Sequence, residues 1–107
     1  MKIKTWNIER ITGYKPKTTY YEDFSIADRF GLAAVKDTYK RVMMHIDSMG
    51  VIYLTELVMV LNWKIWEHCE TNDALAVLYN DLWEQAGAYA REHLEGEDLQ
   101  YYYQTID

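Results

Sequence analysis

The side chains in this sequence best suited to catalysis or metal binding are its histidines, its single cysteine and the acidic residues beside them. Glu67, His68, Cys69 and Glu70 are consecutive. Successive residues of a helix point about 100° apart, so these four side chains cannot all bind one ion. His68 and His93 fall on the core sides of their predicted helices and can converge, but the spacing supplies no third ligand. We expect no metal site and no cofactor, and we keep a helical enzyme or metal protein using these two histidines as an alternative.

The sequence also lacks the common patterns of nucleophilic catalysis. Thiol catalysis needs a histidine aimed at the cysteine, and His68 is adjacent to Cys69 in the chain and therefore poorly aimed at it. A buried, inert thiol is the simpler prediction. No serine lies in a Gly-x-Ser-x-Gly context, and the five glycines form no phosphate-binding loop. We therefore predict a protein that is not an enzyme and has no catalytic residues.

Composition limits the class of protein. The 107 residues suffice for one domain, and a content of 50% hydrophobic and 15% aromatic residues argues against disorder. One cysteine allows no internal disulfide, which fits a reducing compartment. Residues 1–14 contain no apolar segment typical of a signal peptide. The longest apolar run is interrupted by Glu56, Asn62 and Lys64 and is too polar for a membrane span. We expect a cytoplasmic protein without membrane contact.

The net charge of −6 is unevenly distributed along the chain. Residues 1–50 carry nine Lys and Arg against six Asp and Glu, whereas residues 51–107 carry two against eleven. Direct binding to DNA or RNA is disfavoured, because phosphate contacts need clustered positive charge. The acidic second half is either a solvated surface or a face that meets a basic partner protein.

Helical periodicity organises most of the chain. Residues 51–69 form the longest apolar run and are predicted to be the central helix. A helix before it is expected to begin at Ser25, where Ser25 and Asp28 have capping-box spacing, and to break at Gly31 or continue through it. This part of the chain is expected to leave the helix at Gly50. A third helix is expected over 73–94, capped by Thr71 or Asn72.

These elements predict an all-α single domain over residues 1–107. We expect a three-helix up-down-up bundle at 25–95, with an N-terminal arm at 1–24 and a short C-terminal segment at 96–107 packed on it. The arm would dock through Trp6, Ile8, Ile11 and Tyr14, and the tail through Leu99 and its tyrosines.

The central helix is apolar on two sides, which raises the main functional question. One side carries Leu54, Leu57, Val58, Leu61 and Ile65. The other side is either covered by the two chain ends, hidden in a homodimer or open to a partner. We take that side as the candidate partner surface; its residues are Met59, Trp63, Trp66, Glu56, Glu67 and Glu70.

Three segments carry a resemblance to a known family. They are YYEDFSIADRFG at 20–31, KDTYKR at 36–41 and LTELVMVLNWKIW at 54–66, and the likeness extends to GEDL and YYY in the tail. The chain resembles a family of small helical proteins from gut Firmicutes and their phage-like or conjugative mobile elements. The resemblance implies a bacterial or phage origin and an accessory role in a mobile element, and it assigns no activity. Our functional expectation is a protein–protein interaction module acting on a basic or nucleic-acid-handling host protein, with a homodimeric structural protein as an alternative.

Overall fold

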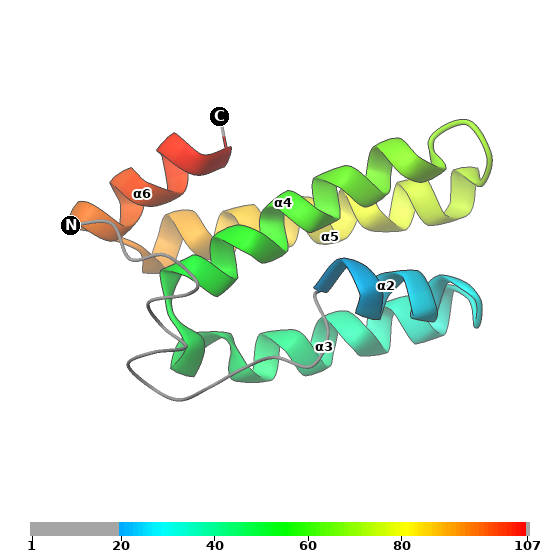
Figure 1. Cartoon of the computed structure of the whole chain (residues 1–107), viewed down its shortest axis with the longest axis horizontal. Coiled ribbons are helices and arrows are strands. Elements are labelled where there is room, and N and C mark those ends of the chain that lie inside the picture. The colour runs from blue at the N-terminus through cyan, green and yellow to red at the C-terminus, as the bar shows by residue number, and fades with distance from the viewer. Residues whose placement is uncertain (1–19, 107) are drawn as a thin grey trace.

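The computed structural model describes residues 20–106, except for the side chains of residues 47–49. Within this range all regular secondary structure is helical and there is no strand, which confirms the predicted all-α class. The helices are α2 (Tyr20–Asp28), α3 (Leu32–Met49), α4 (Val51–His68), α5 (Asp73–His93) and α6 (Gly96–Ile106), as Figure 1 shows.

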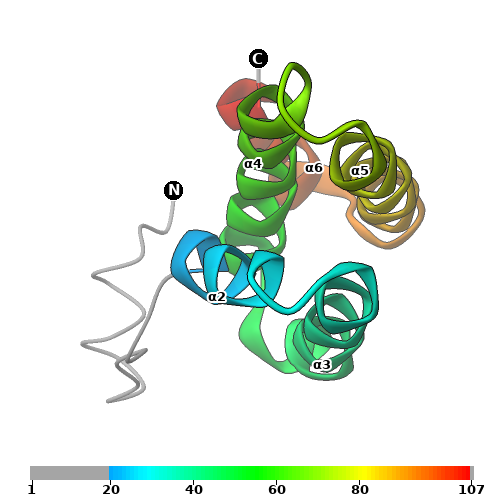
Figure 2. The same ribbon diagram turned by 90° about the vertical axis from the view of Figure 1, so that its right-hand side faces the viewer.

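The central position belongs to α4, which contacts each of the other four described helices. α5 packs along its length, and Figure 2 shows α2 lying beside both α4 and α3. The predicted inner face is confirmed, since Leu54, Leu57, Val58 and Leu61 are buried. Burial of such side chains stabilises a fold by about 1.5–3 kcal/mol each relative to exposure. The bundle is therefore built around α4.

The first helix begins earlier than the sequence predicted. α2 starts at Tyr20, so Ser25 lies in its interior and the predicted capping box at Ser25 is wrong. Phe24 is fully buried, and its packing holds residues 20–24 in the helix where local signals alone do not. Residues 20–24, which the sequence assigned to the N-terminal arm, are therefore helical, and the arm's expected docking residues Trp6, Ile8, Ile11 and Tyr14 lie outside the described range.

Two glycines separate the first helices. Gly31 has φ of 105° and Gly50 has φ of 89°, a region that residues with a Cβ rarely adopt. Gly31 therefore breaks the chain between α2 and α3, and Gly50 ends α3 as predicted. Because α2 is a separate helix, it can pack against both α3 and α4.

The second half follows the sequence prediction more closely. Asn72 caps α5, and its side chain accepts a hydrogen bond from the Leu75 amide at 3.1 Å. The C-terminal segment is a full helix, α6, which contacts α4 and α5 and buries Tyr102. The expectation that the tail packs back is thus confirmed. None of the described helices is long and apolar enough to cross a membrane.

Candidate functional site

A buried ammonium group lies where α2 meets the C-terminal end of α4. The side chain of Lys64 has 0% exposure. Its Nζ is 2.6 Å from Asp28 Oδ2, donates a hydrogen bond to Ser25 Oγ at 3.1 Å, and forms an ion pair with Glu67. A buried charge needs such partners, because desolvation of an isolated ion costs several kcal/mol. Lys64 therefore fixes α2 on α4.

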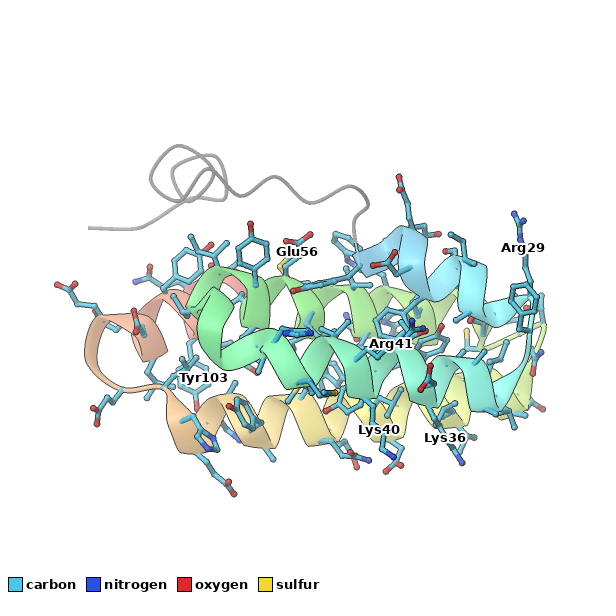
Figure 3. The ribbon with its side chains drawn as sticks, turned by 90° about the horizontal axis from the view of Figure 1, so that it is seen from below. Arg29, Lys36, Lys40, Arg41, Glu56 and Tyr103 are labelled. Atoms are coloured by element: carbon cyan, nitrogen blue, oxygen red, sulfur yellow. The ribbon has the colours of Figure 1, made fainter. Side chains whose placement is uncertain are left out.

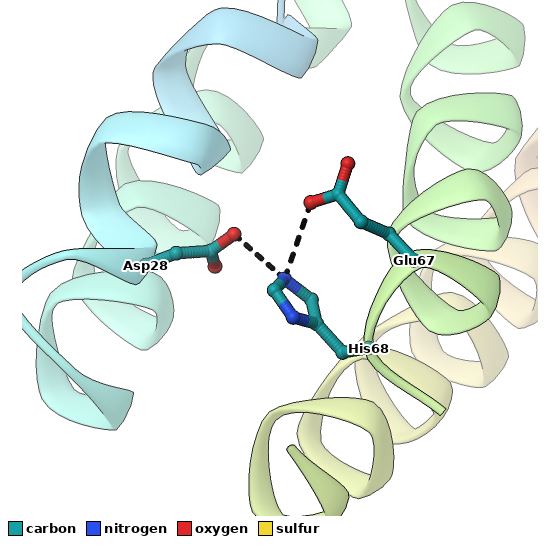
Figure 4. Close-up of side chains that lie close together, drawn as sticks. All are labelled: Asp28, Glu67 and His68. Carbon is teal, nitrogen blue, oxygen red and sulfur yellow. Dashed lines mark hydrogen bonds and ion pairs between the residues drawn. The ribbon is translucent and has the colours of Figure 1, made fainter. Parts of the chain in front are cut away.

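Asp28 is the acceptor that joins three helices. Its Oδ1 accepts a hydrogen bond from the Tyr79 hydroxyl of α5 at 2.5 Å, and its Oδ2 is 2.8 Å from His68 Nε2. The His68 ring stacks on the Tyr79 ring with a centroid separation of 5.7 Å. Figure 4 shows Asp28 facing Glu67 and His68 from the opposing helix. We call Asp28, Lys64, Glu67, His68 and Tyr79 the ion-pair cluster.

The spacing along α4 brings the cluster together. Lys64, Glu67 and His68 are three and four residues apart, so their side chains share one face of the helix. Asp28 is the last residue of α2, and the break at Gly31 leaves it opposite that face. The Tyr21 hydroxyl, near the start of α2, donates to Glu67. Polar side chains of α2 and α4, which are far apart in the sequence, thus supply each other's hydrogen-bond and ion-pair partners.

The contacts within the ion-pair cluster shift the pKa values of Lys64 and Glu67 in favour of their charged forms. Burial alone would lower the pKa of Lys64, but hydrogen bonds to Asp28 and Glu67 and their negative charges outweigh it and raise the pKa. Burial alone would raise the pKa of Glu67, but hydrogen bonds from Lys64 and Tyr21 and the Lys64 charge lower it. Burial and the hydrogen bond to Asp28 raise the pKa of Tyr79 strongly. Lys64 is consequently an ammonium at neutral pH and unsuited to act as a nucleophile.

A metal ion fits this cluster poorly. Asp28, Glu67 and His68 each offer a ligand atom, and these atoms lie within 4.8 Å of one another. The Lys64 ammonium, however, already forms ion pairs with both carboxylates and is fully buried. A divalent cation would have to displace a buried positive charge or lie beside it. The cluster therefore fits a structural ion-pair centre better than a metal site.

Stability should depend on pH through Glu67. Because its pKa is lowered in the folded state, its contribution is present above the unfolded pKa of about 4.3 and is lost as pH falls through the folded value. The free energy of unfolding of Glu67→Gln should therefore approach that of the wild type as pH is lowered toward about 3. The neutral-pH difference should be about 1 kcal/mol or less, since Glu67 is partly exposed.

Urea unfolding at a series of pH values measures this difference. Glu70→Gln is the matched control, because Glu70 is an exposed glutamate three residues later. Burial raises the pKa of Glu56, which adds an opposite pH dependence to every variant and cancels in the comparison. A difference between wild type and Glu67→Gln that stays constant across the acidic range would contradict the role of Glu67.

The other sequence-predicted groups are placed differently. His93 lies at the far end of α5 from the cluster, where its Nδ1 is 2.9 Å from the Tyr89 carbonyl oxygen and its ring stacks on Tyr89. The structure does not bring His68 and His93 together. Cys69 is exposed, and its thiol donates to the Trp66 carbonyl oxygen at 3.2 Å, so the prediction of a buried thiol is wrong. The reason is that Cys69 follows the last residue of α4 and lies beyond the packed core.

The candidate partner surface is one continuous strip of α4. Trp63 and Trp66 are 51% and 72% exposed, while Met59 and Glu56 are half-buried. Glu67 and Glu70 are exposed, but Glu67 turns toward Lys64 and Tyr21. Within residues 20–106, at least half of each tryptophan residue is exposed. We call Met59, Trp63 and Trp66 the α4 tryptophan face.

Comparison with known proteins gives no family. No family model, no curated protein and no solved structure matches the chain. The ion-pair cluster and the α4 tryptophan face are therefore interpreted from their own geometry.

Proposed function

We propose that this protein is a non-enzymatic interaction module whose α4 tryptophan face binds a basic segment of a partner protein. The observation that carries the proposal is the exposure of Trp63 and Trp66, one helical turn apart on the same face. Tryptophan is among the residues most enriched at energetic hot spots of protein interfaces, since it buries a large apolar surface and keeps one hydrogen-bond donor. Two such side chains within one helical turn give a partner protein a large apolar surface to bury.

Charge complementarity favours a basic partner. Glu56 and Glu70 lie on the same strip of α4 as the tryptophans. The charge of Glu67 is already balanced by Lys64, so it contributes less than the sequence alone suggests. The C-terminal end of α4 adds the partial negative charge of its unsatisfied carbonyl groups. A segment carrying Lys or Arg beside an apolar side chain fits these features.

The ion-pair cluster supports this role by fixing the end of the helix that carries the face. Trp63 and Trp66 lie on either side of Lys64 in the sequence, and Glu67 follows Trp66. Lys64 forms ion pairs with Asp28 of α2 and with Glu67, and these contacts hold α2 on the neighbouring side of α4. We propose that α3, α4 and α5 form an up-down-up frame and that α2 locks it. A face held rigid before binding loses less conformational freedom when the partner arrives.

A specific version of the proposal concerns the partner's biology. The resemblance to mobile-element proteins and the acidic second half together suggest an accessory protein that occupies the nucleic-acid groove of a host protein. Such binding should weaken sharply as the salt concentration rises, because it would depend on attraction between the acidic residues of this protein and the partner's phosphate-binding Lys and Arg. Failure to retain any nucleic-acid-handling protein from a host extract at low salt would reject this version and leave the general proposal intact.

Removing both tryptophans should strongly weaken binding of a basic probe. The probe is a fluorescently labelled amphipathic peptide of lysine and leucine, and its anisotropy reports binding. Trp63→Ala/Trp66→Ala should weaken binding at least about 30-fold, because each hot-spot truncation costs about 1–2 kcal/mol or more. Both positions are exposed, so the fold should survive.

Two controls make the result specific. Phe30→Ala removes an exposed aromatic side chain outside α4 and should leave the affinity unchanged. A peptide of glutamate and leucine with the same pattern should not bind. Equal affinity of the wild type and the double variant for the basic peptide would refute the proposal, and so would failure of the wild type to bind it.

A further inference from the structure

A second surface, separate from the α4 tryptophan face, lies between α3 and α5. It is a groove of about 400 Å³ that is widely open to solvent. The residues that line it come from the start of α3 and the first half of α5: Leu32, Lys36, Ala74, Val77, Leu78, Asn80, Asp81 and Glu84. It shares no residue with the ion-pair cluster or with the α4 tryptophan face.

Two apolar side chains of this groove are open to solvent, whereas Leu78 at its floor is buried. Val77 is 70% exposed and Leu32 is 42% exposed, although the periodicity of α3 assigns Leu32 to the inner face with Val35 and Tyr39, which are buried. A small-molecule site would enclose most of its ligand, which a groove this open does not do. The groove therefore suits a macromolecular surface better than a small ligand.

The two walls of the groove carry opposite charges. Lys36 stands on the α3 wall, and Asp81 and Glu84 stand on the α5 wall. Figure 3 shows Lys36, and Lys40 one turn later, on the side of α3 that borders α5. Both helices begin at the same end of the molecule and run in the same direction (Figure 1). The groove is thus apolar in the middle, positive along one edge and negative along the other.

A surface with this polarity is complementary to its own copy. A two-fold axis parallel to the groove exchanges its left and right edges while keeping the helix direction. It places α3 of one copy over α5 of the other. Lys36 of one copy then meets Asp81 and Glu84 of the other, twice by symmetry, and the exposed apolar side chains meet between them. A groove with charges of one sign would repel its copy in the same arrangement.

We propose that a second copy of this chain docks in the α3/α5 groove, forming a two-fold dimer that leaves both α4 tryptophan faces free. The proposal differs from a dimer that hides the tryptophans, because a different face is buried. It does not depend on the proposed function of that face. A dimer of this kind would present two tryptophan faces and strengthen binding to a partner with two basic segments.

Charge reversal tests the proposal without disturbing the core. Lys36→Glu and Glu84→Lys each place like charges opposite one another in the dimer, and both residues are exposed in the monomer. Sedimentation from micromolar to millimolar concentration should show a monomer–dimer equilibrium for the wild type. Each single variant should dimerise at least about tenfold more weakly, because the substitution replaces attraction between the copies by repulsion.

An equimolar mixture of the two variants separates contacts between copies from contacts within one chain. When a Lys36→Glu chain pairs with a Glu84→Lys chain, opposite charges again face each other on both sides of the axis. Dimerisation of the mixture should therefore return to within about threefold of the wild type.

Three outcomes would decide against this interface. A wild type that stays monomeric throughout would overturn the proposal, as would a mixture that dimerises no better than its components. A dimer broken by Trp63→Ala/Trp66→Ala but not by the charge variants would assign the interface to the α4 tryptophan face instead.

Discussion

Replacing Lys64 with alanine should lower the free energy of unfolding by about 3–5 kcal/mol, one of the two largest single-residue effects we expect. The reason is the pair of carboxylates it leaves behind. Asp28 and Glu67 lie side by side at the junction of α2 and α4, and the Lys64 ammonium forms an ion pair with each. Without it, two like charges remain in a partly buried site. Urea unfolding followed by far-UV circular dichroism measures the loss.

Two further variants identify the cause of this loss. Lys40→Ala removes an exposed lysine from α3 and should change stability by less than about 0.5 kcal/mol. Lys64→Met combined with Asp28→Asn and Glu67→Gln removes the charges together and should recover much of the lost stability, because no carboxylate is then left without a counter-ion. A loss below about 1 kcal/mol for Lys64→Ala would show that the cluster does not anchor α2.

Replacing Phe24 with alanine should cost about 3–5 kcal/mol, the usual range for truncating a buried aromatic side chain. Phe24 is fully buried, and its ring packs edge-to-face on Tyr79 at a centroid distance of 5.7 Å. The helix that carries it has nine residues, too few to be stable in isolation. Loss of this contact should therefore free α2 from the bundle as well as lower the global stability.

Hydrogen exchange distinguishes the two consequences. Amides of α2 should exchange fastest among the described helices in Phe24→Ala, while those of α4 should keep most of their protection. Ile26→Ala is the matched control, because Ile26 lies on the same helix but is exposed. Similar losses for Phe24→Ala and Ile26→Ala would contradict the packing of α2 described above.

Periodicity predicted the parts of the fold that depend on local pattern. The inner face of α4, the cap at Asn72 and the stop at Gly50 all follow from residue type and spacing. The start of α2 does not. Residues 20–24 contain two tyrosines and two acids with no strong helix signal, and burial of Phe24 against Tyr79 of α5 decides their conformation.

The ion-pair cluster was missed for a related reason. Reasoning along one helix showed that Glu67, His68 and Cys69 diverge, and that is correct for Cys69, which is exposed. It could not supply Asp28 or Tyr79, because these arrive from other helices. One signal was available in the sequence. Lys64 follows the apolar residues at 60–61 on the buried side of the central helix, and a lysine there requires an acidic partner from elsewhere in the chain.

The candidate partner surface stays a prediction, and the structure changes what is expected of its charges. The helical wheel brings Met59, Trp63 and Trp66 to one strip, and the exposure of both tryptophans agrees with a surface position. The wheel also assigned Glu67 to that strip. Its ion pair with Lys64 changes this, because a partner's cation would have to compete with a buried ammonium. The remaining two acids of the strip, at positions 56 and 70, are therefore the ones to vary in binding experiments.

Quenching of the two α4 tryptophans by acrylamide is the most direct test of the central claim that this face is open and binds a basic segment. Trp6→Phe/Trp83→Phe leaves Trp63 and Trp66 as the only tryptophans of the chain. We predict efficient quenching of this variant alone and marked protection once the lysine–leucine peptide is added. Tryptophans already shielded in the absence of peptide, or equally accessible with and without it, would contradict the account.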